Sequence, residues 1–150
     1  MKSPLEILQQ YFGYENFRLE QANAVKNVIS KKDTFVLMPT GGGKSLCYQV
    51  PALVLEGTTI VISPLIALMK DQVDALRVNG ISAAYINSSM SVYEQNDTFN
   101  QLKDGQLKLL YVAPEKLSAD NGAFLKLLND VNISLFAVDE AHCVSHWGHD

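Results

Sequence analysis

MPTGGGKS, residues 38–45, is the stretch that decides the fold of this chain, because it has the form of a loop that wraps the phosphates of a nucleotide. The three successive glycines carry no Cβ and take positive φ at little cost, so their backbone N–H groups are free to turn toward the phosphates. In such a loop Lys44 reaches the β- and γ-phosphates and Ser45 offers its hydroxyl to Mg²⁺. The stretch therefore predicts a nucleoside triphosphate site.

The context of the loop supports this interpretation. A strand-like run at 34–38 precedes it and a helix-like segment at 44–55 follows it, as the motif requires. Met38 stands where the general pattern has its first glycine, so the match is a variant. The plain alternative is a glycine-rich turn with a solvated lysine. The predicted nucleotide contacts in this segment are Thr40, Gly41, Gly42, Gly43, Lys44, Ser45 and Leu46.

An acidic pattern near the other end of the chain supplies the second half of such a site. The apolar run LFAV, residues 135–138, is followed by Asp139-Glu140-Ala141-His142, which is a Walker B pattern. A buried parallel strand delivers the residues that follow it to the carboxyl edge of the sheet, where ligands bind. We expect Asp139 to hold Mg²⁺ through water and Glu140 to deprotonate the attacking water. Alone, an acidic pair at a strand end is more often a turn or a helix cap.

The candidate residues of the predicted nucleotide site have two roles, catalysis and magnesium binding. The predicted catalytic residues are Lys44, Asp139, Glu140 and His142, and the predicted magnesium ligands are Ser45 and Asp139.

Composition restricts the class of protein. A chain of 150 residues with 47% hydrophobic content suits one domain. The net charge of −4 provides no general basic field, so any nucleic-acid contact must be local. Cys47 and Cys143 are too few for a disulfide framework, which favours an intracellular protein. No apolar run approaches the length of a membrane span, and no signal peptide pattern is present.

Strand and helix signals alternate along the chain. A capping box at 3–6 opens a helix that reaches Gly13, and a second helix is predicted at 19–29. Strands are predicted at 58–62, 83–86 and 107–112, with a helical stripe from residue 65 closed by Gly80. Pro51 predicts a kink or break in the helix after the phosphate loop. This alternation indicates an α/β fold with a mostly parallel sheet between helices.

Two segments give the chain a family resemblance. DEAH after an MPTGGGKS loop resembles the superfamily 2 helicases, and FGYENFRLEQ, residues 12–21, is similar to the motif specific to RecQ helicases. The resemblance implies that Tyr14 and Arg18 stack on the two faces of an adenine ring while Gln21 hydrogen-bonds its edge. An aromatic, a guanidinium and an amide are chemically suited to these tasks. Without the resemblance, Tyr14 and Phe17 would be assigned to the core.

Further segments resemble the DNA-facing motifs of the same family. Residues 63–72 resemble motif Ia, which implies phosphate contacts near Pro64 and Lys70, and 111–115 resemble the next DNA-side motif. Residues 143–150 resemble the start of the aromatic-rich loop, with Trp147 expected to stack on a base, although His146 stands where the family commonly has glutamine. The plain alternatives are an amphipathic helix and a strand with its turn. A zinc site at 142–149 would lack the usual paired ligand spacing.

The resemblance implies a three-layer RecA-like P-loop domain. Residues 1–150 would be the first helicase ATP-binding domain, truncated, with 1–30 recognising adenine. The implied activity is that of an ATP-dependent 3′–5′ DNA helicase using ATP and Mg²⁺, with single-stranded and duplex DNA and a second RecA-like domain as partners. The implied location is the bacterial cytosol or nucleoid, or the nucleus of a eukaryote. Alternatives are an RNA-directed DEAH-box motor and a nucleotide-binding switch module that unwinds nothing.

Overall fold

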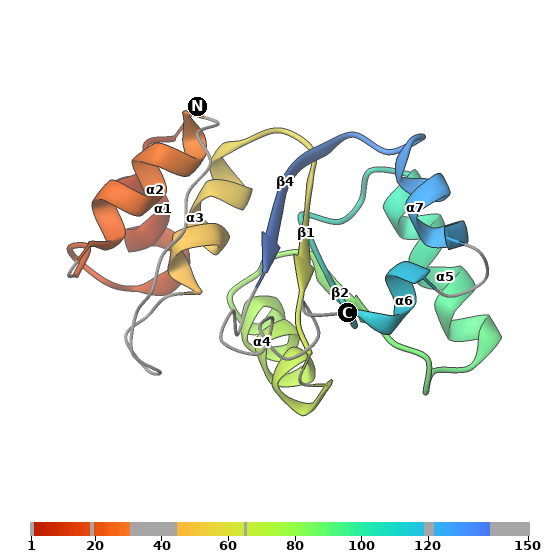
Figure 1. The fold of residues 1–150 in the computed structure, drawn as a ribbon. Coiled ribbons are helices and arrows are strands. Elements are labelled where there is room, and N and C mark those ends of the chain that lie inside the picture. The colour runs from red at the N-terminus through yellow and green to blue at the C-terminus, as the bar shows by residue number, and fades with distance from the viewer. Residues whose placement is uncertain (1, 19, 31–44, 65, 119–121, 139–150) are drawn as a thin grey trace. The chain divides into compact units, whose positions relative to one another are not determined.

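The computed structural model describes residues 2–18, 20–30, 45–64, 66–118 and 122–138 (Figure 1). They belong to two compact units, Met1–Glu56 and Gly57–Asp150, and each unit is described by itself. The predicted strand at 34–38 and the phosphate loop as far as Lys44 lie outside the described residues. The expectation of a single domain stays a prediction.

The first unit is helical. Its elements are α1 (Pro4–Ile7), the π-helix η1 (Leu8–Phe12), α2 (Gln21–Ile29) and α3 (Leu46–Val54). The predicted capping box is confirmed, because Ser3 Oγ accepts from the Glu6 N–H while the Glu6 carboxylate accepts from the Ser3 N–H. The predicted end of the first helix is also confirmed at Gly13, whose φ of 76° is a left-handed conformation that glycine adopts without strain.

The core of the first unit comes from all four of its helical elements. Buried apolar side chains pack there from α1 with η1, from α2 and from α3. They are Ile7, Leu8, Val25, Leu46, Val50 and Val54.

The predicted break at Pro51 is not found, since α3 runs through this residue to Val54. Eight of the nine α3 residues are buried, and this packing outweighs the one backbone hydrogen bond that proline removes.

The second unit is built on a parallel sheet. Its strands are β1 (Thr58–Ile62), β2 (Ala83–Ile86), β3 (Leu109–Val112) and β4 (Ile133–Val138), in the order β2-β3-β1-β4. All three pairings are parallel, which confirms the predicted class. Its helices are α4 (Ile66–Val78), α5 (Val92–Lys103), α6 (Glu115–Ser118) and α7 (Ala123–Leu128). The strand that was predicted at 107–112 begins at Leu109, two residues after its predicted start.

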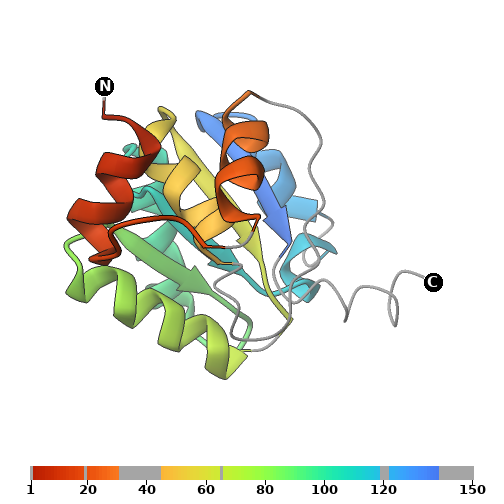
Figure 2. The same ribbon diagram turned by 90° about the vertical axis from the view of Figure 1, so that its left-hand side faces the viewer.

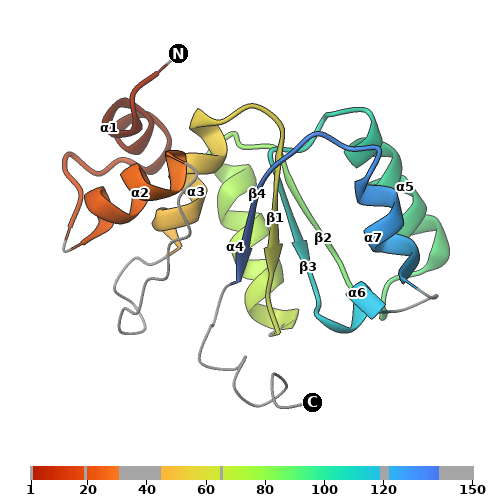
Figure 3. The same ribbon diagram turned by 45° about the horizontal axis from the view of Figure 1, so that its top comes forward.

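Helices lie on both faces of this sheet. Right-handed crossovers that step in opposite directions along the sheet put α4 on one face and α5 with α7 on the other, and Figures 2 and 3 show this arrangement. On the α5 side, Ile60 and Leu110 of the sheet pack with Leu102 of α5 and Phe124 of α7. The predicted arrangement of a sheet between two helix layers is therefore confirmed within this unit.

The outer strands differ in how they are covered. On β4, Phe136 is 54% exposed and Val138 is 46% exposed, so the expected fully buried strand is not observed in the described part of the chain. Phe136 and Val138 are two residues apart and therefore lie on the same face of β4, which pairs only with β1 among the described residues. At the opposite outer strand, Arg77 Nε of α4 donates a hydrogen bond to the Ala83 carbonyl of β2 at 2.9 Å.

Candidate nucleotide and nucleic-acid site

Four strands of the second unit end in register at one edge of the sheet. Ile62 of β1 is the register partner of both Val112 of β3 and Val138 of β4, and Val112 is also the partner of Ile86 at the end of β2. The carboxyl edge of a parallel sheet is where open α/β folds bind ligands. The segment 63–72 follows β1, the segment 111–115 starts in the last two residues of β3, and the DEAH sequence comes directly after Val138 of β4, so three predicted motif segments start from the same edge.

The start of α3 has the form expected behind a phosphate-binding loop. Ser45 takes the N-cap position, and Leu46 is the first helical residue. The Ser45 carbonyl accepts from the N–H of Gln49 at 2.9 Å, while its hydroxyl makes no capping bond to α3. The first N–H groups of a helix attract anions. Residues 38–44, with the predicted contacts from Thr40 to Lys44, fall in the part that the structure does not describe.

The predicted adenine-binding segment lies in the first unit, between η1 and α2. Tyr14 is 50% exposed and, with Gln9, Gly13, Glu15 and Asn16, lines an open pocket of about 500 Å³. The pocket is partly polar, and its single aromatic ring is accessible for stacking.

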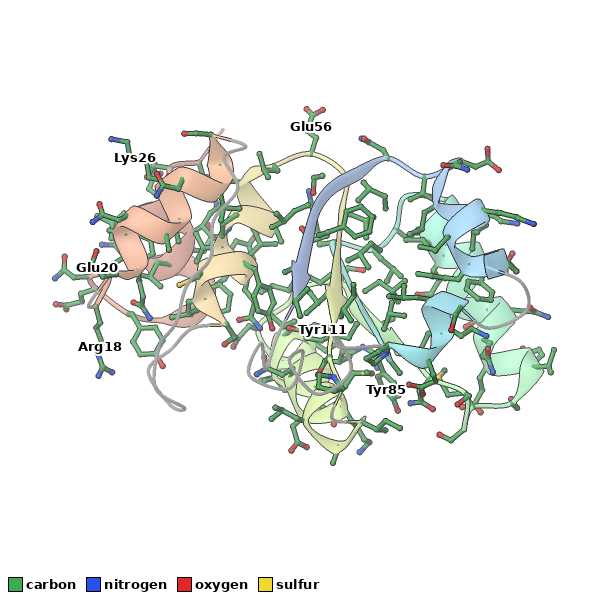
Figure 4. The ribbon with its side chains drawn as sticks, in the orientation of Figure 1. Arg18, Glu20, Lys26, Glu56, Tyr85 and Tyr111 are labelled. Carbon is green, nitrogen blue, oxygen red and sulfur yellow. The ribbon has the colours of Figure 1, made fainter. Side chains whose placement is uncertain are left out.

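The other two predicted adenine contacts are arranged differently. The Arg18 side chain is exposed and extends away from the helices (Figure 4). Gln21 is the first residue of α2 and only 2% exposed, and its Oε1 accepts from the Arg18 backbone N–H at 2.7 Å. Gln21 therefore connects the turn before α2 to the helix itself.

The acidic half of the site begins where the described strand β4 ends. The predicted strand before the DEAH sequence is confirmed, and its last residue, Val138, precedes Asp139 directly. Four predicted residues lie beyond the described part of the chain. They are Asp139, Glu140, His142 and Trp147.

The two other predicted nucleic-acid contacts lie at and beyond the end of β1. Pro64 is half-buried and follows the strand after one residue. Lys70 lies on α4, where its Nζ is 3.6 Å from the Asp74 carboxylate and its side chain is 62% exposed. An exposed i,i+4 pair of this kind contributes only about 0.3–0.5 kcal/mol, so the ammonium is available to another anion.

Sequence reasoning missed three polar groups near the carboxyl edge. Ser63 is 1% exposed, and its hydroxyl has no hydrogen-bond partner among the described residues. Asn87 is also buried, and its Oδ1 accepts from the Ser89 N–H at 2.9 Å. Lys116 is buried and donates from Nζ to Gln95 Oε1 at 2.6 Å. The signal for Ser63 and Asn87 was a polar residue directly after an apolar strand.

Cys47 and the other potential metal-binding side chains were considered as further reactive groups among the described residues. Burial raises the pKa of the Cys47 thiol to about 11, so it stays protonated near neutral pH and is a poor nucleophile or metal ligand. Within the described ranges, no group of three or more acidic, histidine or cysteine side chains is placed to hold a metal ion. The same ranges contain no helix long and apolar enough to span a bilayer.

Comparison with known proteins identifies the class. Residues 18–150 match the model of the DEAD/DEAH box helicase family, and the chain belongs to this family. It is 55% identical over 145 residues to the ATP-dependent DNA helicase RecQ of Bacillus subtilis and 52% identical over 149 residues to that of Pasteurella multocida. These alignments cover 96% and 99% of this chain but only 24% and 23% of the relatives. The chain thus spans about a quarter of their length.

Proposed function

We propose that this chain is the ATP-binding lobe of a RecQ-type ATP-dependent DNA helicase, which couples ATP hydrolysis to 3′–5′ movement on single-stranded DNA and to duplex unwinding. The observation that carries the proposal is the register of Ile62 with Val112 and Val138, because it brings the strand before Asp139 to the same edge as the two strands that lead into the DNA-side motifs. ATP chemistry and DNA contact would then share one edge of one sheet.

The oxygen atoms of the proposed site are suited to a nucleotide that is bound together with magnesium. Ser45 has a hydroxyl that is not used to cap α3, and hydroxyl and carboxylate oxygens are the ligands that magnesium prefers. In this proposal Ser45 and Asp139 hold the ion, and Lys44 binds the β- and γ-phosphates. Bound magnesium would neutralise charge on the phosphates.

The chain's own residues account for the other parts of the reaction. Glu140 accepts a proton from the attacking water. His142 is the remaining proposed catalytic residue, beside Lys44, Asp139 and Glu140. Thr40, the three glycines that follow it and Leu46 surround the phosphates at the start of α3. The half-exposed Tyr14 ring stacks on adenine, with Arg18 on the opposite face of the base and Gln21 at its edge.

DNA binding and movement require more than this lobe. Pro64 and Lys70 contact the phosphate backbone and Trp147 stacks on a base in this proposal. A second RecA-like domain supplies the arginines that stabilise transition-state charge, an effect typically of about 10³–10⁵ in rate. The proposal includes action in the cytosol or nucleoid, or in the nucleus of a eukaryote.

The test begins with nucleotide binding. Lys44→Ala removes a charge-assisted contact to the phosphates and is expected to weaken MgATP binding without unfolding the protein. Isothermal titration calorimetry measures the affinity, and circular dichroism checks the fold. Unchanged affinity in a folded variant contradicts the proposed nucleotide site. An unwinding assay with the full-length protein then separates a helicase from a nucleotide-binding switch, which would bind MgATP and separate no strands.

A further inference from the structure

The loop between η1 and α2 is held by packing at its two ends and is exposed in the middle. The aromatic side chains on either side of it, Phe12 and Phe17, pack against the core of the first unit. Between them, Gly13 turns the chain with a φ of 76°, and residues 14–16 are exposed. An exposed segment with few packing contacts opens at low cost in free energy. The middle of the loop, which carries Tyr14, therefore depends on a hydrogen bond to a fixed element.

A side chain of η1 provides this hydrogen bond. Gln9 Nε2 donates to the backbone carbonyl of Glu15 at 3.0 Å and so joins two residues that are six apart in the sequence. In the part of the chain that the structure describes, it is the one hydrogen bond to the backbone of residues 14–16. The orientation of the amide follows from chemistry, because a carbonyl can only accept and the nitrogen is the only donor of the Gln9 side chain. The bond closes the turn at Gly13.

The place of Gln9 links it to the candidate base site. Gln9 lines the same open pocket as Tyr14 and belongs to a π-helix, a rare element that is frequently found at functional sites. The next residue, Gln10, is also exposed, but its Oε1 accepts a hydrogen bond from Lys2 Nζ. Two adjacent glutamines of one helix thus have different partners, and only Gln9 is bonded to the loop that carries Tyr14.

We propose that Gln9 is a positioning residue for base recognition, whose amide holds the loop at residues 13–16 closed and so presents the Tyr14 ring for stacking on adenine. The inference rests on the proposed function, since it assigns Tyr14 that contact. Gln9 itself does not touch the base. Loss of its hydrogen bond lowers the fraction of protein in which the loop is ready to bind, and the apparent affinity for the base falls by the same fraction.

The experiment compares a ligand with a base and one without in the full-length protein. ATP and inorganic triphosphate are titrated in the presence of Mg²⁺, and thermal unfolding checks the fold. Gln9→Ala is expected to weaken ATP binding by about three- to tenfold, the effect of losing one hydrogen bond that holds the binding conformation. The affinity for triphosphate is expected to stay unchanged, because this ligand offers no base to Tyr14. Unchanged ATP affinity, or an equal loss for both ligands, overturns the inference.

Two further substitutions test whether the donated hydrogen bond is responsible. Gln9→Glu keeps the length of the side chain but offers the Glu15 carbonyl no N–H, so it is expected to lower the ratio of ATP to triphosphate affinity as Gln9→Ala does. Gln10→Ala removes the neighbouring amide and is expected to leave this ratio at the wild-type value. A wild-type ratio in Gln9→Glu, or a lowered ratio in Gln10→Ala, contradicts a role that is specific to the bond with Glu15.

A double substitution tests whether Gln9 acts through Tyr14. In a Tyr14→Ala background, Gln9→Ala is expected to add no further loss of ATP affinity, since the ring that it positions is gone. A further independent loss there overturns the inference even if the single variant is weakened. Failure of the wild-type protein to bind MgATP overturns the proposed function together with this inference, whereas normal wild-type binding with a silent Gln9→Ala overturns the inference alone.

Discussion

The backbone N–H of Arg18 donates a hydrogen bond to the side-chain Oε1 of Gln21, at an N···O distance of 2.7 Å. This bond joins the turn that follows the Tyr14 pocket to the first residue of α2. Gln21 therefore has a structural task in addition to its proposed contact with adenine. The two tasks use different atoms, because the oxygen accepts from Arg18 while an amide nitrogen is the donor for a base.

Two substitutions of Gln21 separate these tasks. Gln21→Ala loses both, so we expect a loss of about 1 kcal/mol of stability together with a weaker preference for ATP over GTP. Gln21→Glu keeps an acceptor for the Arg18 N–H but no amide donor, and we expect it to lose the preference while staying closer to wild-type stability. Thermal unfolding and competitive nucleotide titration measure the two effects. Full ATP preference in Gln21→Glu contradicts base recognition by this side chain.

Tyr14 is predicted to act on affinity without supporting the fold, because half of its surface is exposed. Tyr14→Ala is expected to weaken ATP binding by about 1–3 kcal/mol, the usual range for stacking on a base. Tyr14→Phe keeps the ring and is expected to bind almost normally. Tyr93 on α5 is 82% exposed and offers a matched control, since Tyr93→Ala should change neither affinity nor melting temperature. Equal ATP affinity in Tyr14→Ala and Tyr93→Ala would remove stacking from the proposal.

Glu140→Gln separates binding from hydrolysis. The amide keeps the size of the carboxylate but cannot accept a proton from the attacking water, so the full-length protein is expected to bind ATP normally. Hydrolysis is expected to fall about 10²–10⁴-fold, the usual contribution of a general base. A phosphate-release assay beside a binding titration checks both. Normal turnover assigns the proton transfer to another group.

Replacing Gly57 or Gly105 with alanine is expected to lower the stability of the protein by very different amounts. Both have positive φ, 98° and 71°, so alanine is strained at either position. At Gly105 nothing lies within 4 Å of the new Cβ, and a loss of about 1–2 kcal/mol is expected. At Gly57 the Cβ would lie 2.5 Å from the Asn132 carbonyl oxygen, which should add a further loss of about 1–3 kcal/mol. Denaturant unfolding of the two variants gives the comparison, and equal losses contradict the close approach.

The Cys47 thiol predicts a loss of stability in alkaline solution. Its pKa is raised to about 11 by burial, so the unfolded chain loses this proton at lower pH than the folded protein does. The unfolded state then binds fewer protons than the native state, and stability falls as pH rises from about 8.5 toward 11. Cys47→Ala is expected to flatten this part of the stability profile. An unchanged slope in the variant means that other groups cause the alkaline loss.

Much of the fold could be predicted because local patterns and tertiary packing agree. The strand at 58–62, the helix that Gly80 closes and the Ser3 capping box were found by period and turn chemistry alone. The break at Pro51 and the full burial of β4 were misjudged because both depend on packing partners. Burial of α3 overrides the proline, and one face of β4, which carries Phe136 and Val138, is left partly exposed among the described residues.

Site residues could be predicted where the residue types in a motif point to one kind of chemistry. They could not be predicted where the role of a side chain depends on its place in the folded structure. A lysine and a serine after three glycines point to phosphates directly. Ser63 carried only a general signal, a polar residue directly after an apolar strand, because its burial and its missing hydrogen-bond partner among the described residues appear only in the structure. The role of Gln21 as a link to the turn before α2 likewise depends on a backbone conformation that spacing does not reveal.

The contact between Arg77 and the Ala83 carbonyl has a consequence for concentrated solutions of this protein. An outer strand whose backbone groups are free recruits strands from other molecules, and such recruitment leads to aggregates. Here one acceptor of β2 is already taken by a cationic side chain, which also repels an identical edge that carries the same charge. A strand that added to this part of β2 would therefore have to displace the guanidinium from the Ala83 carbonyl.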